Sequence, residues 1–345
     1  MGLFATERHD KDPWKKSDAW RARKAGQKLG FTASVGEFRA DWLCLKQVFS
    51  FGGWNAERMC WMCRATQPSG EAPYTDVAKS ALWRSLRMKG NQCLEMLVAR
   101  GKALSPLFSL PAFIIQYIII DCLHAIDLGV AADVAGSFFA ELIFAKDGFL
   151  AGPTVENRVS ALWILIKEQY KLLKTPCRLQ ALTKEMIVKS TKNAKPKLRA
   201  KVGEMRHLVP CILAIAKEYC KHVGETAHAK TVVNLFSRLM DFYMFLGIND
   251  FQAETLSRIS YEFSLLYKAL AEEKVQKTRW FLKPKLHLMQ ELCEYMVHDH
   301  GDPSGYWTYM DEDFVGFIAK MASSRGGPRK AKTAPTAVMA RYSAL

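Results

Sequence analysis

Two cysteines, Cys60 and Cys63, stand three positions apart in a stretch rich in Gly, Pro, Cys and Trp that runs from 52 to 106. A Cys-x-x-Cys pair offers two thiolates at a spacing that suits tetrahedral zinc coordination. No second pair of this kind follows along the chain, and the nearest remaining thiols belong to Cys44 and Cys93. The spacing leaves two interpretations open, a zinc site or two ordinary buried cysteines.

A carboxylate and an imidazole stand three residues apart at Asp121 and His124. At the start of a helix this spacing places both side chains on one face, where they could act on the same group or orient one another. The alternative is that Asp121 caps the helix and His124 is an ordinary core histidine. Taken alone, the pair favours the second interpretation.

An acidic triplet, Asp311-Glu312-Asp313, follows the aromatic segment that begins at Trp307. Thr308 and Asp311 have the spacing of a capping box, and acids in a first helical turn complement the helix dipole. Two nearby acids would also suit a divalent metal ion. The spacing does not decide between these roles.

Common enzyme signatures are missing from the sequence. It contains no Walker loop, no dinucleotide fingerprint, no nucleophile elbow and no His-Glu-x-x-His motif. These absences exclude the hydrolases and nucleotide-binding proteins that such motifs identify.

The charge of the chain indicates a polyanionic partner. Its 345 residues include 49 Lys and Arg against 34 Asp and Glu, a formal net charge of +15. Phosphate backbones are the commonest partners of such an excess, because each neutralised phosphate releases counterions. We therefore expect DNA contacts from the basic clusters, whose representative residues are Lys15, Lys16, Arg21, Arg23, Lys195, Lys197, Arg199, Lys201, Arg329 and Lys330.

The cysteines and the apolar runs indicate the compartment. Nine scattered cysteines suggest reduced thiols of a nuclear or cytoplasmic protein rather than a disulfide framework. The most apolar segment, 107–120, is too short to cross a bilayer, so no membrane association is expected.

Three kinds of local pattern predict the elements that position these residues. The β-branched run from Ile114 to Ile120 predicts a buried strand that ends at Asp121, where a helix begins. A short strand leading into a helix is also predicted within 31–51, around Asp41. Beyond Gly152 the apolar residues recur with a helical period, as in 205–219 and 256–270. Since α/β folds often place their chemistry at strand ends, Asp121 is a candidate site residue.

The order of these features resembles that of transposases of the CACTA type and of the related Plavaka-like transposon proteins. The resemblance covers about 35 to 325 and rests on order and context. It is carried by Asp41, the Cys60/Cys63 pair, Asp121-x-x-His124, the Lys-Pro-Lys-x-His run at 283–287, and an aromatic-rich segment that ends at Glu312.

The resemblance implies an RNase H-like fold with a helical insertion, and DNA cleavage and joining by an Asp, Asp and Glu triad that holds two Mg²⁺ or Mn²⁺ ions. Asp41 would be the second Asp and Glu312 the final Glu, while Asp121 and His124 would support the site. We expect Asp41, Glu312 and the Asp121/His124 pair to converge. The first Asp of the family lies well upstream of the second, and no acid before Asp41 lies in an apolar, strand-like run.

From this resemblance we predict an α/β, strongly α-rich protein with an incomplete RNase H-like core and a large helical insertion. The expected segments are a basic arm (1–30), a partial core (31–152) with the Cys-containing insertion (52–106), a helical insertion (153–280), a core segment with Glu312 (281–325) and a basic tail (326–345). The expected function is transposase-derived DNA binding with cleavage lost. The alternative is a non-catalytic helical interaction or scaffold protein, and homo-oligomer formation stays open in both cases.

Overall fold

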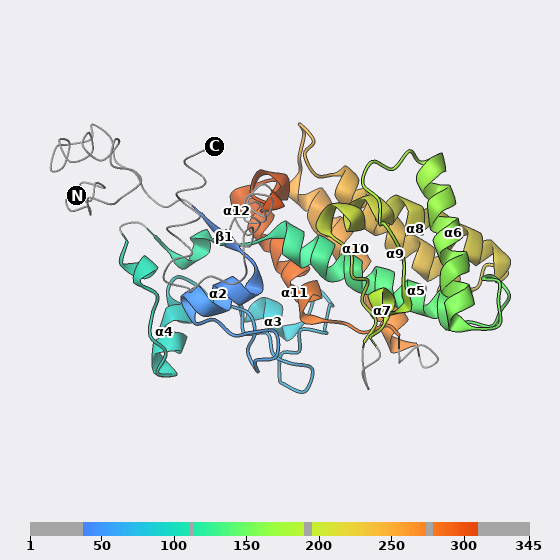
Figure 1. The fold of residues 1–345 in the computed structure, drawn as a ribbon. Coiled ribbons are helices and arrows are strands. Elements are labelled where there is room, and N and C mark those ends of the chain that lie inside the picture. The colour runs from blue at the N-terminus through green and yellow to red at the C-terminus, as the bar shows by residue number, and fades with distance from the viewer. Residues whose placement is uncertain (1–36, 111–112, 190–194, 274–278, 310–345) are drawn as a thin grey trace, which may run out of the picture. The chain divides into compact units, whose positions relative to one another are not determined.

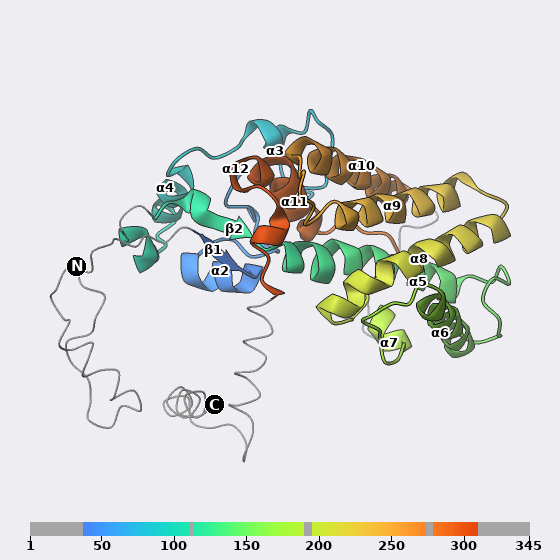
Figure 2. The same ribbon diagram turned by 90° about the horizontal axis from the view of Figure 1, so that it is seen from above.

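A computed structural model describes residues 37–110, 113–189, 195–273 and 279–309. The stretch from Glu37 to Trp307 forms one compact unit. Helices make up most of it (Figure 1), and the described strands form one small parallel sheet, which is labelled in Figure 2. The predicted α-rich character is therefore confirmed, whereas the division into five segments stays a prediction.

The sheet brings together two segments that are far apart in the sequence. Strand β1 (Phe38–Ala40) pairs in parallel with β2 (Ile118–Ile120), and Ala40 lies opposite Ile120. All three isoleucines of β2 are buried, as is usual in parallel sheets covered on both faces. Helix α2 (Trp42–Phe49) follows β1, and the π-helical segment η3 (Leu123–Ala131) follows β2. Both predicted strand-to-helix junctions are confirmed, but the strand predicted over 114–120 is shorter than expected, because Ile115–Tyr117 form the short 3-10 helix η2 and Ile114 is exposed.

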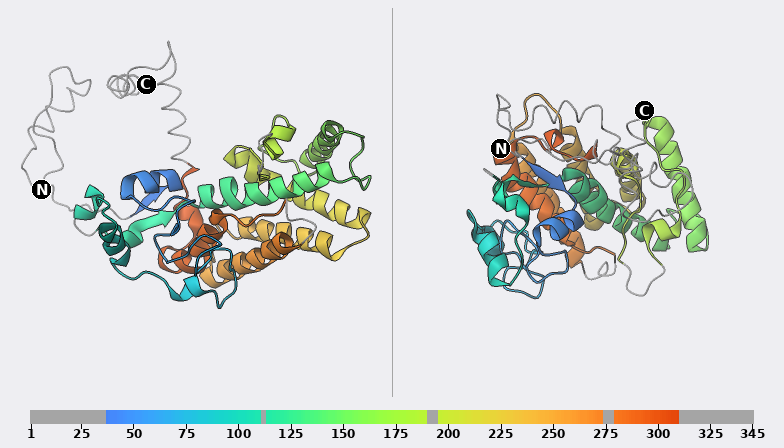
Figure 3. Two further views of the ribbon diagram at one scale, coloured as in Figure 1. Left: turned by 90° about the horizontal axis from the view of Figure 1, so that it is seen from below. Right: turned by 60° about the vertical axis from the view of Figure 1, so that its left-hand side comes forward.

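The segment η3 continues directly into helix α5 (Ala132–Phe144), and the two form the centre of the unit. Every residue of α5 from Ala132 to Ile143 is buried, which requires packing partners all round the helix. Helices α6 (Val155–Leu172) and α8 (Val202–His222) pack against α5. Figures 2 and 3 show α5 running along the layer that α8, α9 and α10 form.

Helices α8, α9 (Ala227–Met244) and α10 (Ala253–Glu272) pack side by side through the apolar faces predicted from their period. On α8, for example, Met205, Leu208, Ile212 and Ile215 are buried. The remaining elements are short: α3 (Leu82–Ser85), α4 (Gln92–Ala99), η1 (Pro106–Ser109), η2 (Ile115–Tyr117), α7 (Lys184–Ile187), α11 (Pro284–Glu291), η5 (Leu292–Met296), α12 (Val297–His300) and η6 (Pro303–Gly305).

The basic segment 195–201 runs directly over α5. The Leu198 amide donates to the Ala132 carbonyl at 2.8 Å. A Cβ atom on Gly136 would lie 2.4 Å from the Lys197 Cα atom and 2.5 Å from the Leu198 amide nitrogen. Since both neighbours are backbone atoms, Gly136 is needed for this close approach.

Gly136→Ala is therefore expected to destabilise the protein by about 2 kcal/mol or more, as overpacking does, although alanine favours an isolated helix by about 1 kcal/mol. Urea denaturation measures the change. Gly305→Ala is the control, because a Cβ atom there meets no atom within 4 Å. A neutral or stabilising effect of Gly136→Ala would contradict this packing.

A histidine with a carboxylate on either side joins three helical segments. His228 Nε2 lies 2.8 Å from Glu141 Oε1, and His228 Nδ1 lies 2.5 Å from Glu273 Oε2. The Trp280 indole also donates to Glu141, at 2.9 Å. Burial lowers the pKa of His228, but the hydrogen bond and charge of Glu141, with those of Glu273, outweigh burial and raise it. A cationic His228 thus holds α9 to α5.

Because the pKa is raised on folding, the stabilisation by His228 is complete below its unfolded pKa of about 6.5 and is lost as the pH rises through the folded pKa. His228→Gln is expected to cost about 1–3 kcal/mol near pH 6 and less near pH 9. Urea denaturation of both proteins at both pH values measures the difference. His298→Gln, at an exposed histidine, serves as the control, and an equal cost at both pH values would contradict the assignment.

Candidate metal centre and strand-end carboxylates

Four potential metal ligands from two distant segments meet in the interior. They are Cys60, Cys63, His287 and Glu291, whose ligand atoms all lie within 4.8 Å of one another. All four residues are buried. Two sulfurs, one nitrogen and one carboxylate oxygen gathered in this way form a group that can hold a metal ion.

Local structure explains how each half of the group is positioned. Cys63 forms an isolated antiparallel bridge with Arg87, which fixes the loop that carries Cys60, Trp61 and Cys63, here called the cysteine loop. His287 and Glu291 lie four residues apart on α11, so they share one face of that helix. Helix α11 begins at Pro284, a residue suited to a first helical position.

The potential ligand atoms of this group lie close to one another. Cys63 Sγ lies 3.3 Å from His287 Nε2, and Cys60 Sγ lies 3.6 Å from Glu291 Oε1. The Met62 amide donates to Cys60 Sγ at 3.3 Å. Burial raises the pKa of Cys60, but the hydrogen bond from Cys63 and the contacts with His287 outweigh it and lower the pKa to about 6. Cys60 is therefore disposed to be a thiolate, the form that binds metals.

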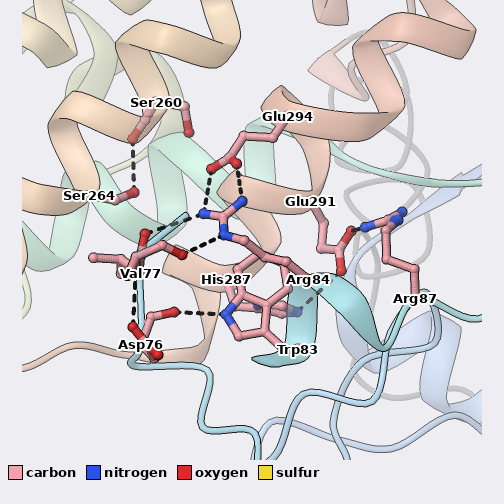
Figure 4. Close-up of polar contacts among 11 residues, drawn as sticks. Asp76, Val77, Trp83, Arg84, Arg87, Ser260, Ser264, His287, Glu291 and Glu294 are labelled. Carbon is pink, nitrogen blue, oxygen red and sulfur yellow. Dashed lines mark hydrogen bonds and ion pairs between the residues drawn. The ribbon is translucent and has the colours of Figure 1, made fainter. Parts of the chain in front are cut away.

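A surrounding layer of side chains holds the ligands in place (Figure 4). Arg87 forms an ion pair with Glu291, and Arg84 forms one with Glu294 on the following turn. The Trp83 ring packs edge-on against His287 at 4.6 Å. His287 Nδ1 has no hydrogen-bond partner in the described part of the chain, so the Trp83 ring and the contact of Nε2 with Cys63 Sγ orient the imidazole. Such outer contacts tune and orient metal ligands.

Local sequence patterns point to only half of this centre. The cysteine pair has a recognisable spacing, but Cys44 and Cys93, the nearest other thiols in the sequence, are not part of the group. His287 falls within the Lys-Pro-Lys-x-His run, and no motif marks Glu291. The available signal was the four-residue spacing of His287 and Glu291, which suits two ligands on one helical face.

A second group of candidate residues lies at the ends of the two strands. Asp41 and Asp121 directly follow Ala40 and Ile120, which are paired in the sheet. Asp41 accepts a hydrogen bond from the Cys44 amide at 2.6 Å and caps α2. Asp121 accepts from the Leu123 and His124 amides, both at 3.2 Å, and lies 2.5 Å from His124 Nδ1. Capping and pairing with His124, the two roles that the sequence allowed, thus occur together.

Lys285 approaches these carboxylates from α11. Its ammonium group donates to the carbonyls of His124 and Leu128, at 2.6 and 3.2 Å. Burial and the charge of Lys197 lower the pKa of Lys285 to about 8, whereas nearby carboxylates, including Asp41 and Asp121, raise it. Lys285 therefore lies within the electrostatic reach of both strand-end acids.

The Lys-Pro-Lys-x-His run thus has three separate structural roles. Lys283 bonds Asp133 and the Pro196 carbonyl, both at 2.8 Å, and Lys285 bonds η3. His287 belongs to the candidate metal centre. Together these contacts fix α11 against both the central helix and the basic segment.

The predicted DNA-contacting residues of the basic segment 195–201 differ in whether their side chains bond to the protein or are exposed. Lys197 donates to the Leu128 carbonyl at 2.7 Å, and Arg199 donates to the Glu185 carbonyl. Lys195 and Lys201 are exposed, and Lys195 lies over the Phe281 ring at 4.7 Å. The other predicted residues lie outside the described part of the chain: Glu312, Lys15, Lys16, Arg21, Arg23, Arg329 and Lys330. The predicted convergence of Glu312 with Asp41 therefore stays a prediction.

No helix within the described ranges is long and apolar enough to cross a membrane. Comparison of the chain with protein-family models gave no match, and comparison with curated proteins gave none either.

Proposed function

We propose that this is a DNA-binding protein of transposase origin, built on an RNase H-like core. The observation that carries the proposal is the placement of Asp41 and Asp121 directly after paired residues of two parallel strands. Side chains at the carboxyl ends of such strands commonly form the functional site of an α/β fold. This placement agrees with the resemblance, which puts Asp41, Asp121 and His124 around one site.

The distribution of positive charge supports DNA as the partner. Lys285 lies beside the strand-end acids, and Lys197 donates to the same Leu128 carbonyl as Lys285 does. From Lys197 the basic segment continues through Arg199 to Lys201. Such a row of cations would bind phosphates and release their counterions.

We further propose that DNA cleavage has been lost. Two-metal phosphoryl transfer needs carboxylate oxygens that are free to bridge two Mg²⁺ or Mn²⁺ ions. Here Asp41 and Asp121 already accept backbone hydrogen bonds, and the Lys285 ammonium group lies among the charges that face them. The positive charge of Lys285 repels divalent ions, and the carboxylate oxygens that accept hydrogen bonds are less free to bind them.

For the candidate metal centre we propose a structural zinc ion. Thiolate, imidazole and carboxylate are the ligand types that zinc takes in proteins, and four protein ligands are typical of structural sites. Cys60, Cys63, His287 and Glu291 would hold the ion, and all four are buried. Zinc would join the cysteine-containing segment to α11, and so fix the helix that carries Lys285.

The proposal is tested with duplexes of unrelated sequence and with supercoiled plasmid in Mg²⁺ or Mn²⁺. We expect similar, weak binding to every duplex and no nicking, because phosphate contacts carry no sequence information. Nicking that disappears in a Glu312→Gln variant would overturn the loss of cleavage. Undetectable duplex binding would instead favour the helical scaffold protein.

A further inference from the structure

A cavity of about 540 Å³ lies between the end of α2, the loop that follows it, and α4. Its volume falls within the range of about 300–1,000 Å³ typical of small-molecule sites. It uses neither the strand-end acids nor the basic segment 195–201. Cys60 and Trp61 of the cysteine loop form part of its wall.

The charge of the cavity wall is strongly unbalanced. Lys46, Arg58, Arg100 and Lys102 line it, and Glu57 is its single acidic residue. None of the four cations forms an ion pair within the described part of the chain. Unpaired cations around a concave surface concentrate anions there, because the low-dielectric walls focus their field.

The inner wall is apolar and aromatic. Phe51 and Trp61 are stacked in parallel with their ring centres 5.4 Å apart, and Leu97 lies on the opposite helix. Trp61 is only 3% exposed, and its indole N–H finds no acceptor among the described residues. Because the indole nitrogen is itself fully buried, Trp61 contributes apolar ring surface to the wall rather than a hydrogen-bond donor.

The loop that forms the wall is held in place before any ligand arrives. The Trp42 indole donates to the Gly52 carbonyl at 2.9 Å. The side-chain amide of Gln67 donates to the carbonyls of Trp54 and Ala56, both also at 2.9 Å. This loop displays Trp54, which is 56% exposed, between two residues of the cavity wall. An exposed aromatic ring beside cations is the usual platform for an unpaired base.

We propose that this cavity binds one nucleotide unit, with its phosphate on the Lys46/Arg100 side and its base toward Phe51 and Trp61. The unit could be a free nucleotide or part of a single strand, since both offer the same phosphate and base. A duplex does not fit, because its bases are stacked and paired. This site goes beyond the duplex binding proposed above and does not depend on it.

The test measures binding of dTMP, a short oligo-dT strand and inorganic phosphate by calorimetry, and of a duplex by gel shift. The key variant is Lys46→Glu/Arg100→Glu, since both side chains are exposed and unpaired and their reversal should not affect folding. The control is Lys171→Glu/Lys217→Glu, which makes the same change in net charge on α6 and α8.

We expect dTMP or the strand to bind the wild type and the control. The key variant should bind at least about tenfold more weakly, because it loses charge-assisted bonds to the phosphate. Binding of the strand alone would identify a nucleic-acid strand as the occupant, and binding of dTMP alone a free nucleotide. The proposal is overturned if neither dTMP nor the strand binds the wild type, if both double variants lose the same affinity for them, or if phosphate binds as tightly as dTMP. It is also overturned if the key variant loses as much affinity for the duplex as for dTMP or the strand.

Discussion

Purified protein is expected to carry one zinc ion per chain, and His287→Ala is expected to remove both the ion and much of the stability. The variant leaves two buried thiols and a buried carboxylate without their common partner. Because structural zinc contributes its binding energy to folding, we expect a loss of at least about 3 kcal/mol, or about 10 °C in Tm. Elemental analysis and thermal denaturation measure the two effects.

Two cysteine variants provide a matched comparison for this prediction. Cys63→Ser should behave as His287→Ala does, since it removes another ligand of the same group. Cys44→Ser should keep its zinc, because Cys44 lies outside the group and is partly exposed. Full zinc content in Cys63→Ser, or wild-type protein free of zinc with an unchanged Tm after chelation, would contradict the metal centre.

Neutralising the basic segment is expected to weaken duplex binding strongly. The variant Lys195→Gln/Arg199→Gln/Lys201→Gln removes three cations of the basic segment 195–201. Each lost phosphate contact reduces counterion release, so we expect at least about a tenfold loss of affinity at moderate salt. Gel-shift titration of a single duplex measures the change.

A second triple variant controls for net charge in this experiment. Lys171→Gln/Lys217→Gln/Lys221→Gln removes the same charge from exposed positions on α6 and α8. It should bind duplex nearly as the wild type does. An equal loss of affinity in both triple variants would mean that overall charge, and not the basic segment, binds the DNA.

The parts of the fold that local patterns encode could be predicted. The β-branched run before Asp121 predicted a buried strand at Ile118–Ile120, because burial of a strand selects such residues, although the strand is shorter than the run. The helical spacing of the apolar residues in α8 predicted which face of that helix is buried. The capping and pairing of Asp121 and His124 also followed from spacing alone, since both involve neighbours in the chain.

The parts that depend on packing between distant segments could not be predicted. Cys63 and His287 are 224 residues apart, and no spacing rule connects them. The π-helical form of η3 has no local signal, and it accompanies the bonds that Lys197 and Lys285 make to its carbonyls. Likewise, the cavity beside Trp61 is lined by residues of α2, of the loop that follows it and of α4, which no local pattern connects.

The salt dependence of duplex binding tests the proposed function most directly. The affinity of wild-type protein for a duplex of arbitrary sequence would be measured from about 50 to 200 mM salt. A charge of +15 with clustered cations predicts a steep, linear fall of log affinity with log salt, with a slope of several units. A slope near zero, or no binding even at the lowest salt, would contradict DNA binding as the function of this protein.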